Sequence, residues 1–203
     1  MIAIIDYGVG NLFSLKSSLA MIGARAVVTG DAGEIAAAER IILPGVGAFG
    51  DARRKLALAG LDRVLCNQAA QGKPLLGICL GMQLLFEKSF EYGEHEGLSL
   101  IPGSVVPLAG RIPPQLKVPH IGWNALDIRR PSHPLMKYTK SGDCVYFVHS
   151  YYADGVGGAL VASSEYGIDV TAAVARDNVM GCQFHPEKSG QVGLGILKAF
   201  CEV

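Results

Sequence analysis

The chain has 203 residues, half of them hydrophobic, which suits one domain over residues 1–203 with a full core. Lys and Arg together number 18, as do Asp and Glu, so the formal net charge is zero and the basic footprint of a nucleic-acid-binding protein is missing. The N-terminus lacks the charged region and apolar core of a signal peptide, and no apolar stretch reaches the roughly 20 residues of a spanning helix. We therefore expect neither nucleic acid nor a membrane as a partner.

The first half of the chain alternates short apolar runs with helical patterns. These patterns predict strands at 1–6, 24–28, 40–43 and 74–78. They predict helices at 12–22, 32–38 and 52–71, the last interrupted near Gly60. Such β-α-β-α alternation predicts an α/β fold with a parallel sheet and helices on both faces.

The second half changes character, because its apolar runs follow one another with short connections. We expect strands at 98–100, 105–108, 144–149, 159–163, 171–175 and 179–185, and a closing helix at 191–201. This succession predicts an antiparallel extension beside the main sheet. The proline-rich stretch 112–119 reads as a surface loop and not as a domain boundary.

Cysteine usage bears on location and on metal binding. The five cysteines are scattered and odd in number, which argues against a disulfide framework and favours a reducing, cytoplasmic location. Neither Cys-x-x-Cys nor His-x-x-x-His spacing is present, so the sequence predicts no metal and no cofactor. We expect only one of the five cysteines to take part in catalysis. The five are Cys66, Cys79, Cys144, Cys182 and Cys201.

The sequence Gly77-Ile78-Cys79-Leu80-Gly81 follows an apolar run and precedes an amphipathic one. This order is typical of a nucleophile elbow, in which a strand, a sharp turn and a helix expose the nucleophile above the sheet. Gly77 and Gly81 leave room for the turn because they carry no Cβ. The helix N-terminus favours a thiolate, and the Leu80 N–H is suited to a developing oxyanion.

More than a hundred residues later, His185-Pro186-Glu187 follows a second apolar run. His185 would take the thiol proton and return it to a leaving group, while Glu187 would hold the imidazole tautomer. In extended backbone residues two apart point the same way, so we expect Glu187 to reach behind the His185 ring.

Taken alone, each segment also has a structural explanation. The first fits a buried cysteine beside tight packing, and the second fits a surface turn; their joint occurrence after apolar runs favours catalysis. Gly8-Val9-Gly10 after the first strand hints at a dinucleotide loop, but Phe13 occupies the place of the third glycine and no suitable acid follows about 20 residues later.

Over nearly its whole length the chain resembles class I (triad-type) glutamine amidotransferases. The elbow and His-Pro-Glu are shared by that class, while three further segments make the chain most similar to the glutaminase subunits of imidazole glycerol phosphate synthase. These are Pro44-Gly45-Val46-Gly47, His120-Ile121-Gly122-Trp123-Asn124 and Phe147-Val148-His149-Ser150-Tyr151. The resemblance implies a flavodoxin-like, three-layer α/β fold with a mostly parallel sheet, helices on both faces and an antiparallel β extension.

The resemblance also implies a reaction. Cys79 would attack the side-chain amide of glutamine, His185 would protonate the departing ammonia, and the γ-glutamyl thioester would be hydrolysed to glutamate. The implied oxyanion donors are the Leu80 N–H and the Gly45-Val46 backbone. Because Val46 stands where a second glycine would flex more freely, we expect this peptide to favour an inactive orientation until activation.

Substrate and partner contacts follow from the same resemblance. The implied glutamine-binding residues are Gln83, Glu91, Ser150 and Tyr151, with Ser150 and Tyr151 acting mainly through their backbones. The implied partner is a (β/α)8-barrel cyclase subunit of imidazole glycerol phosphate synthase, which consumes the ammonia and makes imidazole glycerol phosphate and AICAR in histidine biosynthesis. The implied interface residues are Asn11, Trp123, Tyr146 and Lys188. Trp123, the only tryptophan, would equally suit a core.

Three other functions stay open at this point. The chain could serve a different synthase, although a Pro-Gly-Gly loop would fit that better. A self-standing cysteine hydrolase of γ-glutamyl compounds would act without a partner. A flavodoxin-like binding module with an incidental cysteine would not react with a glutamine-mimicking electrophile.

Overall fold

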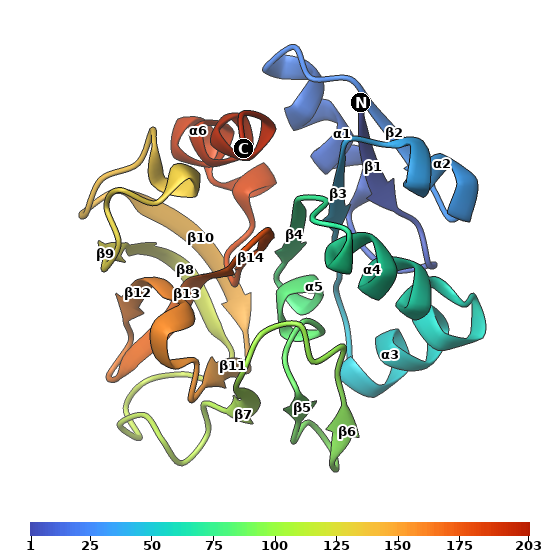
Figure 1. Ribbon diagram of the computed structural model, residues 1–203. Coiled ribbons are helices and arrows are strands. Elements are labelled where there is room, and N and C mark those ends of the chain that lie inside the picture. The colour runs from blue at the N-terminus through green and yellow to red at the C-terminus, as the bar shows by residue number, and fades with distance from the viewer.

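The computed structural model describes residues 1–203 and is built on an eight-stranded sheet with the order β2-β1-β3-β4-β14-β13-β12-β9 (Figure 1). The first five strands run parallel, and the other three continue the sheet antiparallel. In sheet order they span Ala26–Thr29, Ile2–Ile5, Arg40–Leu43, Leu75–Ile78, Val179–Cys182, Asp169–Arg176, Leu160–Glu165 and Asp127–Ile128.

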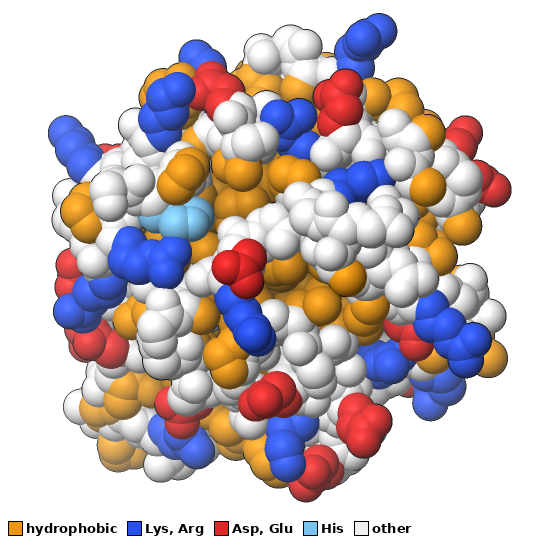
Figure 2. All heavy atoms as spheres, in the orientation of Figure 1, with side chains coloured by type: hydrophobic (Ala, Val, Ile, Leu, Met, Phe, Trp, Pro, Cys, Tyr) orange, Lys and Arg blue, Asp and Glu red, His pale blue; other side chains and the backbone are white.

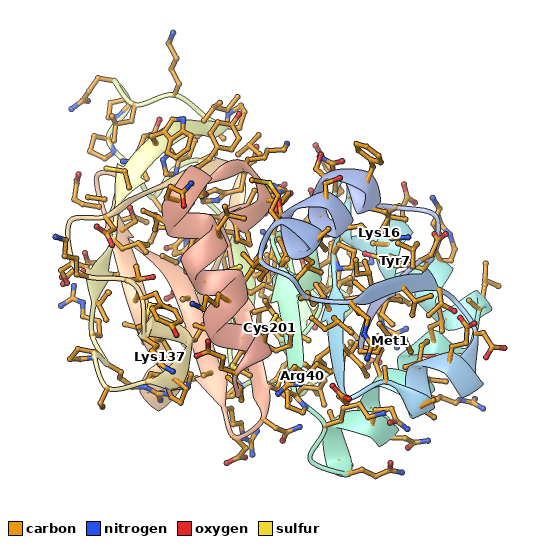
Figure 3. All side chains as sticks on the ribbon, turned by 90° about the horizontal axis from the view of Figure 1, so that it is seen from above. Met1, Tyr7, Lys16, Arg40, Lys137 and Cys201 are labelled. Carbon is orange, nitrogen blue, oxygen red and sulfur yellow. The ribbon has the colours of Figure 1, made fainter.

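Helices cover both faces of this sheet, and the alternation of side chains along strand β1 shows why. Ile2 and Ile4 join a core cluster with residues of α1 (Leu12–Met21) and α6 (Gly190–Cys201). Ala3 and Ile5 point the other way, into a cluster with residues of α2 (Ala32–Ala37), α3 (Phe49–Leu58) and α4 (Leu61–Ala70). Figure 3 shows α1 and α6 side by side over one face. The predicted three-layer α/β fold is therefore confirmed.

The antiparallel extension is also confirmed, but it is divided among three sheets. Beyond the continuation of the main sheet, β8 (His120–Ala125) pairs with β10 (Cys144–His149). A four-stranded sheet has the order β11-β7-β5-β6, in which β7 and β5 pair parallel and the other two pairs are antiparallel; its strands are Tyr151–Asp154, Ser104–Pro107, Lys88–Ser89 and His95–Glu96. Among the strands of these two sheets, the sequence predicted β10 and β7 and missed β5, β6, β8 and β11; it also missed β9 of the main sheet.

Two expected strands differ from the structure. Residues 98–100 form no strand, because the N–H groups of Leu98 and Leu100 donate to the carbonyls of Leu84 and Leu85, which lie in a loop and not in a neighbouring strand. The strand expected at 179–185 ends at Cys182, and Pro186–Lys188 forms the 3-10 helix η3. The other 3-10 helices are η1 (Pro134–Met136) and η2 (Gly157–Ala159).

The surface agrees with the balanced composition. Acidic and basic side chains are interspersed on the face in Figure 2, with hydrophobic side chains gathered between them. No helix has both the length and the apolar character required to cross a membrane.

Candidate active site

The predicted nucleophile turn is present between β4 and the short helix α5 (Leu80–Gln83). Cys79 has φ 54° and ψ −112°, a backbone conformation that is strained for any residue with a Cβ. A Cβ on Gly81 would lie 1.8 Å from the Leu43 carbonyl oxygen, and one on Gly77 would lie 2.7 Å from backbone atoms of Met82. Only glycine fits at either position, so the main chain itself holds the thiol at the end of β4.

His185 and Glu187 meet as predicted, but through a different backbone. His185 Nδ1 lies 2.8 Å from Glu187 Oε1, and the two side chains are only 3% and 4% exposed. The expectation of extended backbone was wrong, because Glu187 lies in η3. Proline at the first position of that turn reverses the chain, so that the carboxylate folds back onto the ring.

The main chain at His185 is clamped to strand β10. Its N–H donates to the Tyr146 carbonyl at 2.9 Å. The Ser189 hydroxyl donates to the His185 carbonyl at 2.6 Å and accepts from the Tyr146 N–H at 3.0 Å. Strand β10 is thereby joined to the segment of the base by two hydrogen bonds, and Ser189 links the second of them back to His185.

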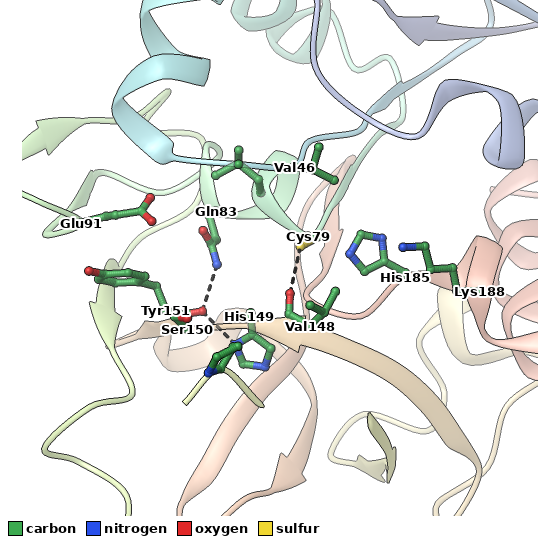
Figure 4. Close-up of a pocket in the computed structure, with 13 residues that line it drawn as sticks. Val46, Cys79, Gln83, Glu91, Val148, His149, Ser150, Tyr151, His185 and Lys188 are labelled. Atoms are coloured by element: carbon green, nitrogen blue, oxygen red, sulfur yellow. Dashed lines mark hydrogen bonds between the residues drawn. The ribbon is translucent and has the colours of Figure 1, made fainter. Parts of the chain in front are cut away.

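The electrostatics of His185 favour its imidazolium. Burial by itself lowers the pKa of His185, but the adjacent Cys79 and Glu187 outweigh it and raise the pKa to about 9. His185 Nε2 is buried without a hydrogen-bond partner, and Figure 4 shows the ring beside Cys79. The ring is thus held from behind by a carboxylate while its other nitrogen is free for proton transfer.

Cys79 and His185 open onto a cavity of about 380 Å³. Figure 4 shows Lys188 and His185 at one end and Glu91 with Tyr151 at the other. Its lining consists of Val46, Gly47, Cys79, Leu80, Gln83, Glu91, Pro119, Val148, His149, Ser150, Tyr151, His185 and Lys188. All four predicted glutamine-binding residues are among them.

The hydrogen bonds narrow what Gln83 offers to a ligand. Gln83 Nε2 donates to the Tyr151 carbonyl and to Gln183 Oε1, each at 3.0 Å. Both amide hydrogens of Gln83 are therefore used within the protein, and its Oε1 is the atom left for a ligand.

Ser150 and Tyr151 were expected to contact a substrate through their backbones, and the carbonyls of both are already occupied. The Tyr151 carbonyl accepts from His149 Nδ1 at 2.9 Å in addition to Gln83. The Ser150 carbonyl accepts from the Leu108 N–H at 2.9 Å. The carbonyl oxygens of Ser150 and Tyr151 are thus used in hydrogen bonds within the protein.

Glu91 is neither buried nor freely solvated. Its Oε2 accepts from the Phe49 N–H at 2.6 Å, at the N-terminus of α3, where a carboxylate is stabilised by the helix dipole. The same side chain lines the cavity, so it joins the helix end to the site.

The predicted oxyanion loop runs along the cavity beside Cys79. Val46 is 43% exposed and lines the cavity, whereas Gly45 is buried behind it, where a Cβ would lie 2.8 Å from the Gly81 nitrogen. The Tyr7 hydroxyl donates to the Pro44 carbonyl at 2.8 Å, and burial raises the pKa of Tyr7 above its usual range, so it remains a donor. The loop is therefore held by a hydrogen bond at Pro44, whereas Val46 is exposed to the cavity.

A buried pair of histidines lies under the cavity. His149 Nε2 is 3.1 Å from His120 Nδ1, and His120 Nε2 is 2.8 Å from Asn124 Oδ1. Burial, reinforced by His120, lowers the pKa of His149 to about 3, which keeps it neutral. Asn124 lies on β8 next to Trp123, so this chain of contacts joins β8 to the Tyr151 carbonyl.

Three of the four predicted interface residues form one row. The Trp123 side chain meets Tyr146 edge-on, with ring centroids 6.0 Å apart, and Lys188 Nζ lies 5.8 Å over the Tyr146 ring. Trp123 is 55% exposed, so it does not belong to the core. Asn11 caps helix α1, accepting from the Ser14 N–H at 3.4 Å.

Sequence reasoning gave no role to several residues that the structure brings to the site. Gln183 lies two residues before His185, Ser189 lies two residues after Glu187, and Tyr7 follows the first strand. Only Gln183 carried a signal in the sequence, because a polar amide in an apolar run close to the predicted base needs a partner once buried, and it is 0% exposed in the structure. No group of three or more His, Cys, Asp or Glu side chains is arranged to hold a metal ion.

Fold and site together define a class-I glutamine amidotransferase, and a protein-family model described as "Glutamine amidotransferase class-I" matches residues 3–202. The fold is shared with a solved structure described as "Crystal structure of glutamine amidotransferase", with a TM-score of 0.76 and 18% identity over 99% of this chain and 100% of that one. "Structure of PurLQS from Thermotoga maritima" gives a TM-score of 0.73 and 19% identity over 99% and 97%.

Curated relatives are much closer in sequence. "Imidazole glycerol phosphate synthase subunit HisH" of Caldanaerobacter subterraneus subsp. tengcongensis is 53% identical over 100% of this chain and 98% of its own. The protein of the same name from Syntrophotalea carbinolica is 50% identical over 98% of each. The chain therefore belongs to the class-I glutamine amidotransferase family and, within it, to the family of imidazole glycerol phosphate synthase HisH subunits.

Proposed function

We propose that this chain is the glutaminase subunit of imidazole glycerol phosphate synthase. It hydrolyses glutamine to glutamate and ammonia and passes the ammonia to a (β/α)8-barrel cyclase partner. The observation that carries the proposal is the buried His185–Glu187 pair beside a strained Cys79 at one end of a cavity of about 380 Å³. Membership of the HisH family supports the particular synthase.

The proposed chemistry assigns one task to each member of the triad. His185 Nε2 takes the Cys79 proton, and the sulfur attacks the side-chain amide carbon of glutamine. The C–N bond breaks and the nitrogen leaves as ammonia with the proton from His185. Water then attacks the thioester with His185 as base, and glutamate leaves as the proton returns to the sulfur. Glu187 holds the imidazolium through Nδ1 throughout.

The cavity accommodates the substrate in one direction. With its carboxamide at Cys79, glutamine extends toward Glu91 and Tyr151 at the far end (Figure 4). The Glu91 carboxylate then meets the α-ammonium group. Because the carbonyls of Ser150 and Tyr151 are occupied, we propose that their N–H groups serve the α-carboxylate. The Leu80 N–H and the Gly45-Val46 peptide would hold the oxyanion.

The proposed partner surface is the row formed by Trp123, Tyr146 and Lys188, together with Asn11, which lines a small cavity with His185 and Glu187. An exposed tryptophan packed on a tyrosine is the kind of aromatic anchor that dominates interface energies. The main chain of Tyr146 is hydrogen-bonded to the segment that carries the proposed base, His185. A partner bound to this row would therefore touch the strand that positions the catalytic imidazole. We place the complex in the cytoplasm, consistent with five free cysteines.

The test measures glutamate release from glutamine in three states of the protein. These are the chain alone, the chain with a cyclase subunit of imidazole glycerol phosphate synthase, and that complex with the nucleotide ligand of the cyclase. We expect activity mainly in the last state, because we propose that the Gly45-Val46 peptide completes the oxyanion hole only on activation. Full activity of the chain alone would favour a self-standing hydrolase, and none in any state would contradict the proposal.

A matched variant tests the surface. Trp123→Ala should weaken binding of the cyclase by at least about tenfold, as expected for an aromatic anchor. Leu58→Ala provides the control, because Leu58 is 82% exposed and lies on α3, outside the proposed surface. Equal binding by Trp123→Ala and the unaltered chain would exclude this surface.

A further inference from the structure

Gln183 is a fully buried side chain to which the proposed mechanism assigns nothing. It follows the last residue of β14, is 0% exposed, and its main-chain N–H donates to the Ala172 carbonyl at 2.8 Å. Its side chain lies between Gln83 and Cys79. Gln183 Oε1 accepts from Gln83 Nε2 at 3.0 Å, and Gln183 Nε2 lies 3.7 Å from Cys79 Sγ.

The direction of these hydrogen bonds is fixed by the Tyr151 carbonyl, the first acceptor of the series. A backbone carbonyl only accepts, so the group that Gln83 turns to the Tyr151 carbonyl must be its NH₂. The second hydrogen of that NH₂ points to Gln183, which must therefore accept it with its side-chain oxygen. Gln183 is then left with its own NH₂ facing the sulfur, and neither amide can be turned without placing two like groups together.

The sulfur accordingly lies between one acceptor and one donor. As a thiol, Cys79 donates toward the Val148 carbonyl, 4.0 Å away. As a thiolate it has no proton to give and accepts from Gln183 Nε2. A hydrogen bond from an N–H group to an anion is stronger than one to a neutral acceptor. The contact with Gln183 therefore favours the thiolate form of Cys79 over the thiol.

We propose that Gln183 is a positioning residue that stabilises the Cys79 thiolate through a hydrogen bond whose direction is set by Gln83 and the Tyr151 carbonyl. This inference rests on the proposed function and adds a residue to it. The thiolate exists twice in each cycle, before its electron pair forms the C–S bond and again when that bond breaks in thioester hydrolysis. Gln183 assists at both points without touching the substrate.

The test replaces the donor by a side chain of similar length that has none, Gln183→Met. Carbamidomethylation of Cys79 by iodoacetamide is followed at a series of pH values, with the labelled peptide identified by mass spectrometry. We expect the midpoint of the rate profile to rise by about one pH unit or more, as for loss of a hydrogen bond to a charged group. In the complex with the cyclase, kcat should fall about tenfold or more while KM for glutamine changes less than about twofold.

Two further variants make the result decisive. Gln68→Met alters another buried glutamine, on α4, and should keep the unaltered midpoint. Gln83→Met removes the group that fixes the Gln183 amide, so it should raise the midpoint in the same direction, by less, and should serve if Gln183→Met does not fold.

The two levels of the proposal fail separately. An unchanged midpoint in Gln183→Met or, if that variant is unfolded, in Gln83→Met overturns the inference while the unaltered complex still releases glutamate. An unaltered complex that releases no glutamate refutes the proposed function and leaves the iodoacetamide comparison standing.

Discussion

The nucleophile side and the base side of this site are held by different means. Cys79 is positioned by main chain packed on main chain, with Gly77 and Gly81 where a Cβ would clash. His185 depends in addition on side chains: Glu187 contacts its ring at 2.8 Å, and the Ser189 hydroxyl donates to its carbonyl at 2.6 Å, beside one main-chain hydrogen bond to Tyr146. The first belongs to the parallel strands and the second follows β14, where the antiparallel part of the sheet begins.

This difference determines how each side tolerates change. A backbone-packed turn has no alternative geometry, so an added methyl group must displace a neighbouring segment. A base held by hydrogen bonds keeps its place when one bond is lost but changes its protonation. Four substitutions test this comparison, in order of the expected effect.

The largest effect is expected for Cys79→Ala, which removes the proposed nucleophile. Glutamate release in the activated complex should fall by at least about 10⁴-fold, because the members of a triad act as a unit. The measurement is the initial rate of glutamate formation. Cys144→Ala is the matched control, since Cys144 is exposed at the start of β10. If Cys79→Ala kept a tenth of the rate, another nucleophile would have to be sought.

Glu187→Gln comes next and acts on the base side without changing its shape. The rate should fall by about 10² to 10⁴-fold, as when a triad carboxylate is neutralised. Thermal unfolding should show the variant folded. A loss of less than about threefold would contradict the orienting role of Glu187.

The same variant has a signature in stability against pH. The pKa of His185 is raised from 6.5 to about 9 in the folded protein, so its proton stabilises the fold fully below pH 6.5. That stabilisation is lost as the pH rises through about 9. Because Glu187 is one cause of the raised pKa, urea unfolding of Glu187→Gln should show a smaller decline across this window. Equal declines would mean that Glu187 does not act on the ring.

Gly81→Ala tests the nucleophile side. The new Cβ would lie 1.8 Å from the Leu43 carbonyl oxygen, so Leu43 or α5 must move. We expect the free energy of unfolding to drop by about 3 kcal/mol, the upper part of the range for overpacking, and activity to drop with it. Gly158→Ala is the control, because nothing lies within 4 Å of a Cβ there. A stable, fully active Gly81→Ala would show that the turn is less constrained than its geometry indicates.

The smallest effect is expected at the far end of the cavity. Glu91→Gln keeps an acceptor for the Phe49 N–H but removes the charge, so stability should change by less than about 1 kcal/mol. KM for glutamine should rise about tenfold with little change in kcat, since the lost ion pair binds ground state and transition state alike. A fall in kcat without a rise in KM would move Glu91 from substrate binding to catalysis.

Much of the fold was predictable because its signals are local. Strand β3 and the break at Gly60 between α3 and α4 follow from short apolar runs and one glycine with φ 68°. The family, recognised from the elbow, His-Pro-Glu and three further segments, is confirmed. Strands β5, β6 and β9 were missed because two residues carry no periodicity.

The site was predictable as a set of residues but not as a network. The contact between His185 and Glu187 was foreseen for the wrong reason, because a 3-10 turn takes the place of extended chain. The position of Gln183 against Cys79 depends on how β14 lies beside β4, which no local pattern encodes. The roles assigned to these side chains stay predictions until the experiments above are done.

The Tyr151 carbonyl oxygen, where Gln83 and His149 both donate, is an atom that every amino acid possesses. Any residue at position 151 would supply this acceptor, whereas positions 83 and 149 must keep side chains that donate to it. Neither alanine scanning nor a comparison of related genes would reveal an acceptor at position 151. Chemical synthesis that alters the carbonyl itself, such as a thioamide at this peptide bond, would expose its contribution.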